Sequence, residues 1–263
     1  MVNKRKYCLF LTVFVTGAAV LMLELLGTRI IAPFYGTTIY VWSSLISVTL
    51  VCLALGYFIG GKIADRRPQF TMLYLFILLA GLSVVLLSVV DSLVLAATDP
   101  LGPRWGALCS TFILFSLPMF FLGTITPYAI KVKAEELKHI GVTSGNLYGV
   151  STIGSFAGAL LTGFILIPNL AISTVVNVIA LLLFAVVVMG FILEKKYYGL
   201  LVTPLLAVFL LPQPTLSLAE DIEVVYQTES IYGKVAVVDS ANLRFLLING
   251  ATQTWYKLDT GEF

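Results

Sequence analysis

The chain has 263 residues, of which 59% are hydrophobic and only 11% are charged, with a formal net charge of +2. A soluble globular domain carries roughly 25% charged residues, so this composition, with a mean hydropathy of +1.00, excludes an ordinary water-soluble fold. The basic residues form short clusters between apolar runs, an arrangement that does not predict nucleic-acid binding. The sequence therefore predicts an integral membrane protein whose main partner is the lipid bilayer.

Seven stretches approach the length of about 20 apolar residues that a membrane-spanning helix needs. In chain order they are residues 7–27, 39–61, 72–96, 106–130, 146–167, 171–193 and 198–217. The seventh is the weakest because two prolines follow its apolar core, and whether it crosses fully stays open. We expect residues 1–219 to form an all-α membrane domain, a polytopic bundle of about seven transmembrane helices that is major facilitator-like in part.

Lysine and arginine residues are distributed unevenly between the two sides that these spans define. With the N-terminus in the cytoplasm, eleven of them lie in inside segments and two, Arg29 and Arg104, lie outside. Short cytoplasmic loops are rich in Lys and Arg, so we predict a multi-pass protein of the plasma membrane with a cytoplasmic N-terminus. Seven spans place the C-terminal tail outside, whereas a re-entrant last segment would place it inside.

From residue 220 onward the sequence has ordinary polarity and strand-like alternation. The runs 223–227, 233–238 and 243–248 are rich in β-branched and aromatic residues, and turn signals separate them. We expect residues 220–263 to form an incomplete antiparallel β-hairpin unit. So short a unit buries little core of its own, and we expect it to lean on the membrane domain or on another chain.

Two charged residues, Glu24 and Arg29, lie near the end of the first span. A charge near the hydrocarbon costs roughly 2.5–3.5 kcal/mol on insertion scales and usually faces a protein interior with a partner. The functional interpretation is a substrate, ion or proton site, and the structural one is an ion pair that fixes this span to its neighbours. Both stay open, since residues five apart on a helix point in different directions.

Other candidate polar residues lie at the ends of later spans. Asp65 and Arg66 fall in the turn after the second span, where they can cap helix ends and bridge to another loop. Asn146 and Tyr148 begin the fifth span as site residues or ordinary interface residues. No metal-ligand spacing, nucleotide loop or Ser-His-Asp set is visible in the sequence, so we assign no catalytic, cofactor-binding or metal residue to this chain.

Small residues at four-residue spacing predict two sites of close helix contact. One is Gly56-xxx-Gly60 in the second span. The other consists of two rows in the fifth span: Ser151, Ser155, Ala159 and Gly163, and Gly154, Gly158 and Thr162.

Several stretches resemble spermidine synthase-like transmembrane proteins. In the membrane domain they are Leu23-Glu24-Leu-Leu-Gly-Thr-Arg29-Ile-Ile-Ala-Pro33-Phe-Tyr-Gly36 with Trp42, then Gly56-Tyr-Phe-Ile-Gly60-Gly61-Lys-Ile-Ala-Asp65-Arg66, Leu122-Gly123-Thr-Ile-Thr-Pro127-Tyr128, and Gly145-Asn-Leu-Tyr148-Gly149-Val-Ser151-Thr-Ile-Gly154-Ser155. The stretch ending in Asp65-Arg66 also looks like a loop of major facilitator transporters. In the tail, Glu229-Ser230-Ile-Tyr232-Gly233-Lys-Val-Ala-Val-Val-Asp239 and Leu246-Leu-Ile-Asn249-Gly250-Ala-Thr-Gln253 look like the N-terminal β-domain of aminopropyltransferases.

In that family the β-domain precedes a Rossmann-like domain, which binds decarboxylated S-adenosylmethionine and supplies an acidic residue that deprotonates the attacking amine. The sequence shows neither the glycine-rich loop nor that acidic residue. The resemblance therefore implies a membrane module that anchors or docks a separately encoded Rossmann-like transferase chain and is not catalytic alone. Gln253, at the end of the second tail motif, is a further candidate polar residue. Two alternatives are a transporter for polyamine-like small molecules and a non-functional remnant.

Overall fold

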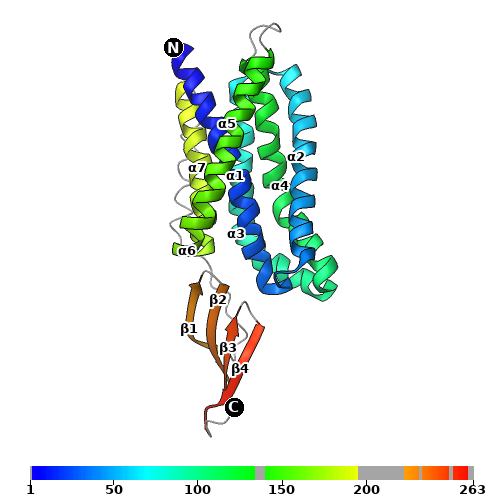
Figure 1. Cartoon of the computed structure of the whole chain (residues 1–263), viewed down its shortest axis with the longest axis vertical. Coiled ribbons are helices and arrows are strands. Elements are labelled where there is room, and N and C mark those ends of the chain that lie inside the picture. Colours follow the sequence, from blue (N-terminus) through cyan, green and yellow to red (C-terminus); the bar gives the residue numbers. More distant parts are fainter. Residues whose placement is uncertain (1, 134–139, 195–221, 231–232, 249–250, 260–263) are drawn as a thin grey trace.

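The structure is a computed structural model that describes residues 2–133, 140–194, 222–230, 233–248 and 251–259. These residues form a bundle of long apolar helices and a small sheet beyond one end of the bundle (Figure 1). The helices are α1 (Val2–Tyr35), α2 (Ile39–Arg66), α3 (Phe70–Thr98), α4 (Gly102–Lys133), α5 (Ile140–Leu160), α6 (Ile167–Asn169) and α7 (Ile172–Leu193). A 3-10 turn (Asp99–Leu101) links α3 to α4, and a π-helical segment (Leu161–Leu166) links α5 to α6.

Five helical segments of the described residues are long and apolar enough to cross a membrane, so the predicted count of seven spans is not supported. The stretches predicted at 72–96 and 106–130 fall within one segment of 64 residues, Phe70–Lys133, in which α3 and α4 pack along each other. The seventh predicted stretch, 198–217, lies outside the described residues. The helices support the interpretation as a helical membrane protein, because a helix satisfies its own backbone hydrogen bonds in lipid.

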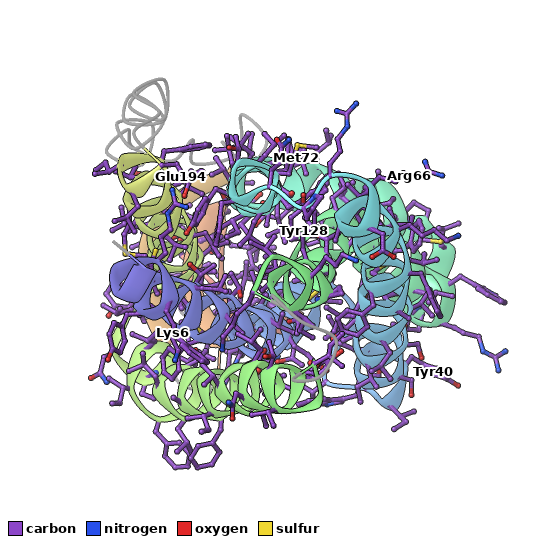
Figure 2. The ribbon with its side chains drawn as sticks, turned by 90° about the horizontal axis from the view of Figure 1, so that it is seen from above. Lys6, Tyr40, Arg66, Met72, Tyr128 and Glu194 are labelled. Atoms are coloured by element: carbon purple, nitrogen blue, oxygen red, sulfur yellow. The ribbon has the colours of Figure 1, made fainter. Side chains whose placement is uncertain are left out.

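Helix α4 lies in the middle of the bundle, in contact with α1, α2, α3 and α5 (Figure 2). Its contact with α2 is formed by glycines. A Cβ atom added to Gly56 would meet the carbonyl oxygen of Phe120 and lie 2.9 Å from the Cα atom of Gly123. A Cβ atom at Gly60 would lie 2.7 Å from the Cα atom of Thr124. The predicted close approach at Gly56-xxx-Gly60 is therefore confirmed.

Helix α5 packs along α1 through the predicted small residues. A Cβ atom at Gly158 would lie 2.8 Å from the Cα atom of Ala18, and the Ser155 hydroxyl donates a hydrogen bond of 2.8 Å to the carbonyl oxygen of Gly17. Gly163 differs from the other small residues, because a Cβ atom there would meet no atom within 4 Å. The rows are thus packing surfaces over most of their length and open into free space at their end.

Polar contacts hold the two ends of the bundle. At the end with the N-terminus, Arg5 of α1 forms an ion pair of 3.2 Å with Glu194, which follows α7. At the opposite end, the Tyr35 hydroxyl of α1 donates a hydrogen bond of 2.7 Å to the Thr98 hydroxyl of α3. Gly36 then reverses the chain with a φ of 71°, a conformation that glycine adopts without steric cost.

The four strands of the sheet are β1 (Ile222–Ser230), β2 (Gly233–Ser240), β3 (Leu243–Ile248) and β4 (Ala251–Lys257). Their order is β1-β2-β3-β4, and each pair is antiparallel. The first three strands confirm the predicted runs, whereas β4 was not predicted because threonines and a glutamine make up its first half. Val238 is the only buried side chain among the sheet residues whose exposure is described, so the sheet has almost no core of its own.

Candidate functional site: a polar cavity between the helices

An open cavity of about 870 Å³ lies at the end of the bundle opposite the N-terminus. Its walls are the last turns of α1, the last turns of α3, the segment from the π-helix to α6, and the first turns of α7. Charged and polar side chains line it together with apolar ones. The polar members are Thr28, Arg29, Thr37, Trp42, Ser88, Asp91, Ser92, Asn169 and Ser173.

The π-helical segment shapes one wall of this cavity. The backbone N–H of Ile167 donates to the carbonyl oxygen of Thr162, five residues back, which inserts one extra residue into the turn. Gly163 lines the cavity without a side chain, and Pro168 offers no backbone N–H to continue the ladder. Leu170 is then extended, and α7 starts in the reverse direction. Such π-segments are frequent at functional sites.

Arg29 is the one predicted site residue that lines the cavity, and Asp91 of α3, which was not predicted, lines the same cavity. Asp91 carries the same signal as Glu24, a lone carboxylate in a predicted span, and could have been found by it. One carboxylate oxygen of Asp91 accepts a hydrogen bond of 2.6 Å from the backbone N–H of Ser92. A cation and a carboxylate from two helices thus share one solvent-accessible space.

Glu24 does not line the cavity, although it is on the same helix as Arg29. Helix α1 continues without interruption through both residues, so the two side chains point in different directions. Among the described residues no ion pair joins them. Arg29 therefore lines the cavity without an ion pair to Glu24.

Asp65 and Arg66 lie at the other end of the bundle, far from the cavity. The Asp65 carboxylate forms an ion pair of 2.8 Å with the Lys131 ammonium, which joins the end of α2 to the end of α4. Arg66 lies at the periphery, whereas Tyr128 lies between the helices (Figure 2). The Tyr128 hydroxyl donates to the carbonyl oxygen of Arg67 and so holds the turn between α2 and α3. The polar contacts at this end of the bundle therefore hold the helices α2, α3 and α4 together.

The remaining predicted residues are exposed and apart from the cavity. Asn146 and Tyr148 are on the exposed side of α5. Gln253 lies in β4 at a register shift, because Leu246 pairs with Thr254 while Leu247 pairs with Thr252. A β-bulge of this kind re-aims side chains at a sheet edge. The predicted residues therefore do not form one site.

A row of charged and polar side chains, which was not predicted from the sequence, crosses the sheet. Arg244 of β3 donates two hydrogen bonds of 2.6 Å to the carboxylate of Asp239 on β2, and one of 3.3 Å to the hydroxyl of Tyr256 on β4. These hydrogen bonds hold the pKa of Asp239 below its usual range. The three residues are direct cross-strand partners, a relation that only the strand register reveals. The row joins the three strands β2, β3 and β4.

The described residues contain no group of three or more His, Cys, Asp or Glu side chains that could hold a metal ion. Comparisons of the chain with protein-family models, with curated proteins and with solved structures give no match. The resemblance to spermidine synthase-like proteins therefore rests on the sequence motifs alone. The chemistry that the cavity can support is binding of a ligand that has polar and apolar parts.

Proposed function

We propose that the chain is the membrane module of a spermidine synthase-like, polyamine aminopropyltransferase-related system. In this proposal the helical bundle anchors the assembly and the sheet docks a Rossmann-like transferase domain. The observation that carries it is the exposure of the edge strand β1 among the described residues. Val238 is 4% exposed, whereas Val224, Val225 and Tyr226 on the edge strand β1 are 45%, 46% and 58% exposed. An apolar edge of this kind is a template for pairing with another domain.

The tail motifs supply the identity of the docked domain, since they resemble the β-domain that accompanies such a transferase. The chain itself is not catalytic in this proposal. Decarboxylated S-adenosylmethionine would bind to the docked domain, because the sequence has no glycine-rich loop between a strand and a helix to hold a nucleotide.

The proposed orientation is a cytoplasmic N-terminus in the plasma membrane with the sheet outside. It follows from the basic residues at the N-terminal end of the bundle, since the sheet lies beyond the opposite end (Figure 1). A reporter fused after residue 263 tests it. Activity of a reporter that folds only outside supports this orientation, and activity of one that works only in the cytoplasm contradicts it.

The docking role is tested by affinity purification of the full chain from cells that express it, with mass spectrometry of the bound proteins. The matched variants are Tyr226→Lys on the edge strand β1 and Thr252→Lys, an exposed residue on β4. We expect a Rossmann-type transferase to accompany the wild type and the β4 variant, and to be lost from the β1 variant. Absence of any such transferase, or equal loss from both variants, contradicts the docking role.

Small-molecule transport is the second candidate function, and the cavity favours it. Arg29 makes the cavity a poor match for a polyamine, because it places a positive charge beside a polycation. Uptake into vesicles that contain the purified chain tests transport. Loss of uptake in Asp91→Asn, with retention in Asp65→Asn at the other end of the bundle, supports it. Unchanged uptake in both Asp91→Asn and Glu24→Gln contradicts it.

A further inference from the structure

We propose that the cavity between α1, α3 and α7 binds the zwitterionic head group of a phospholipid, with the start of its acyl chains against the apolar part of the wall. The proposal goes beyond docking of a transferase and does not depend on it. It rests on four features of the cavity: its pair of charges, its hydroxyl groups, its apolar lining and its position along the bundle.

The charges of the cavity select a dipolar ligand. The planar guanidinium of Arg29 suits a phosphate, to which arginine binds with two parallel hydrogen bonds. No hydrogen bond or ion pair to another described residue is found for Arg29. Asp91 adds the negative charge of a carboxylate to the same space. A polyanion would be repelled by Asp91 and a polycation by Arg29, whereas a molecule that carries both a phosphate and an amine is complementary to both charges.

Two hydroxyl groups of the lining favour a ligand that donates hydrogen bonds. The Thr28 hydroxyl donates to the carbonyl oxygen of Leu25, and the Ser88 hydroxyl donates to that of Val85, each at 2.8 Å. A hydroxyl whose proton is used in this way keeps its lone pairs as acceptors. Both groups can therefore accept from an ammonium, but neither is ready to donate to a second phosphate.

The rest of the wall is apolar, which distinguishes a lipid from a small polar solute. These residues come from α1, α3, α6 and α7 and include Leu25, Ile30, Pro33, Leu95, Ile172 and Val176. Binding sites for organic ligands typically have about 300–1,000 Å³ and combine such walls with few polar groups. A volume of about 870 Å³ accommodates a head group with part of its chains.

The position of the cavity matches the head-group level of a bilayer. Arg5 and Arg29 are on one continuous helix, about 36 Å apart along its axis at 1.5 Å per residue. The hydrocarbon core of a bilayer is about 30 Å thick, so Arg29 lies at one interface when Arg5 lies at the other. Tyr40, Trp42 and Trp105 are exposed near this end, where tyrosine and tryptophan prefer the interface.

The test measures lipid retention by native mass spectrometry of the full chain in detergent after incubation with phosphatidylethanolamine. Gly163→Leu fills the cavity, and it fits because a Cβ atom there meets nothing within 4 Å. Its matched control is Gly149→Leu on α5, where an added Cβ atom also meets nothing within 4 Å but which does not line the cavity. Arg29→Gln removes the guanidinium that binds the phosphate. Its control is Arg104→Gln, which changes an exposed arginine at the same end.

We expect Gly163→Leu to abolish retention and Arg29→Gln to weaken it by about tenfold or more, the loss that a charged hydrogen bond represents. Both controls should retain the lipid as the wild type does. Equal retention by all four variants overturns the proposal. So does equal retention of anionic phosphatidylglycerol by the wild type, which removes the role of Asp91. Binding of free phosphoethanolamine as tightly as the lipid would assign the cavity to a soluble solute instead.

Discussion

The backbones of helices α2 and α4 are in direct contact at glycines, whereas backbone hydrogen bonds and one charged row join the strands of the sheet. In the bundle, a Cβ atom at Gly60 would lie 2.7 Å from the Cα atom of Thr124, so the fit leaves no room for an added methyl group. In the sheet, most side chains whose exposure is described remain accessible and Val238 alone is buried. The bundle is therefore sensitive to volume, and the sheet depends on pairing and on whatever covers it.

The difference follows from the two solvents. Lipid gives helices no hydrophobic reason to associate, so close packing of small residues holds them together. A small sheet in water needs a covered apolar face to be stable on its own. The bundle contains the close helix contacts that stabilise helices in lipid. The sheet has little of the apolar packing that stabilises a sheet in water.

The largest effect is expected from a methyl group placed between α2 and α4. Gly56→Ala should destabilise the bundle by about 2–3 kcal/mol, because the added Cβ atom meets backbone that cannot move aside. The measurement is thermal unfolding of the full chain in detergent. Gly61→Ala on the same helix is the control, since a Cβ atom there meets nothing within 4 Å. It should stabilise by about 0.5–1 kcal/mol through the helix preference of alanine, and equal effects of both changes would contradict the close contact.

A smaller effect is expected from the one buried side chain of the sheet. Val238→Ala should cost about 1.5 kcal/mol, since it removes two carbons at roughly 0.8 kcal/mol each. Urea unfolding followed by the fluorescence of Trp255, with the other two tryptophans replaced by phenylalanine, measures the sheet alone. Val224→Ala on the exposed edge should change stability by less than about 0.5 kcal/mol. A similar cost for both valines would mean that β1 is covered too.

The smallest effect is a pH dependence of the sheet. Hydrogen bonds from Arg244 hold the pKa of Asp239 below its usual value, so the ion pair stabilises the folded sheet. That contribution is complete above the unfolded pKa of about 3.9 and is lost as the pH falls through the lower folded pKa. The same urea assay at pH 5.5 and at pH 3 should show a drop in the wild type that is reduced in Asp239→Asn.

Tyr256→Phe serves as the control for the charged row, because it removes only the third hydrogen bond of Arg244. It should keep most of the pH dependence. If it abolishes the drop as fully as Asp239→Asn does, the stabilisation belongs to the network with Tyr256 and not to the ion pair.

Local patterns predict most of the fold. Apolar length predicts the helices, small residues at four-residue spacing predict their contacts, and alternation predicts three strands. The number of spans is not predictable in this way: five helical segments of the described residues are long and apolar enough to cross a membrane, and the stretch at 198–217 lies outside the described residues. Strand β4 is not predicted because its polar first half has no apolar alternation.

The candidate site is less predictable than the fold. Arg29 is identified from its position in a span, but its companion Asp91 is 62 residues further along the chain, and only the packing of α1 beside α3 and α7 brings both into one cavity. Likewise Asp239, Arg244 and Tyr256 look unremarkable in the sequence and become a row only through strand register. Long-range placement of polar groups is thus the part that local patterns do not contain.

The shape of the cavity depends on the one extra residue that the π-segment Leu161–Leu166 inserts into its helix. An α-helix turns by about 100° per residue, so deletion of one residue here would restore an ordinary helix and rotate all that follows by that angle. Pro168 and Asn169 would then leave the cavity wall, and α7 would begin from a different direction. A single-codon deletion in this segment would thus reshape the cavity with every charged side chain still present in the sequence.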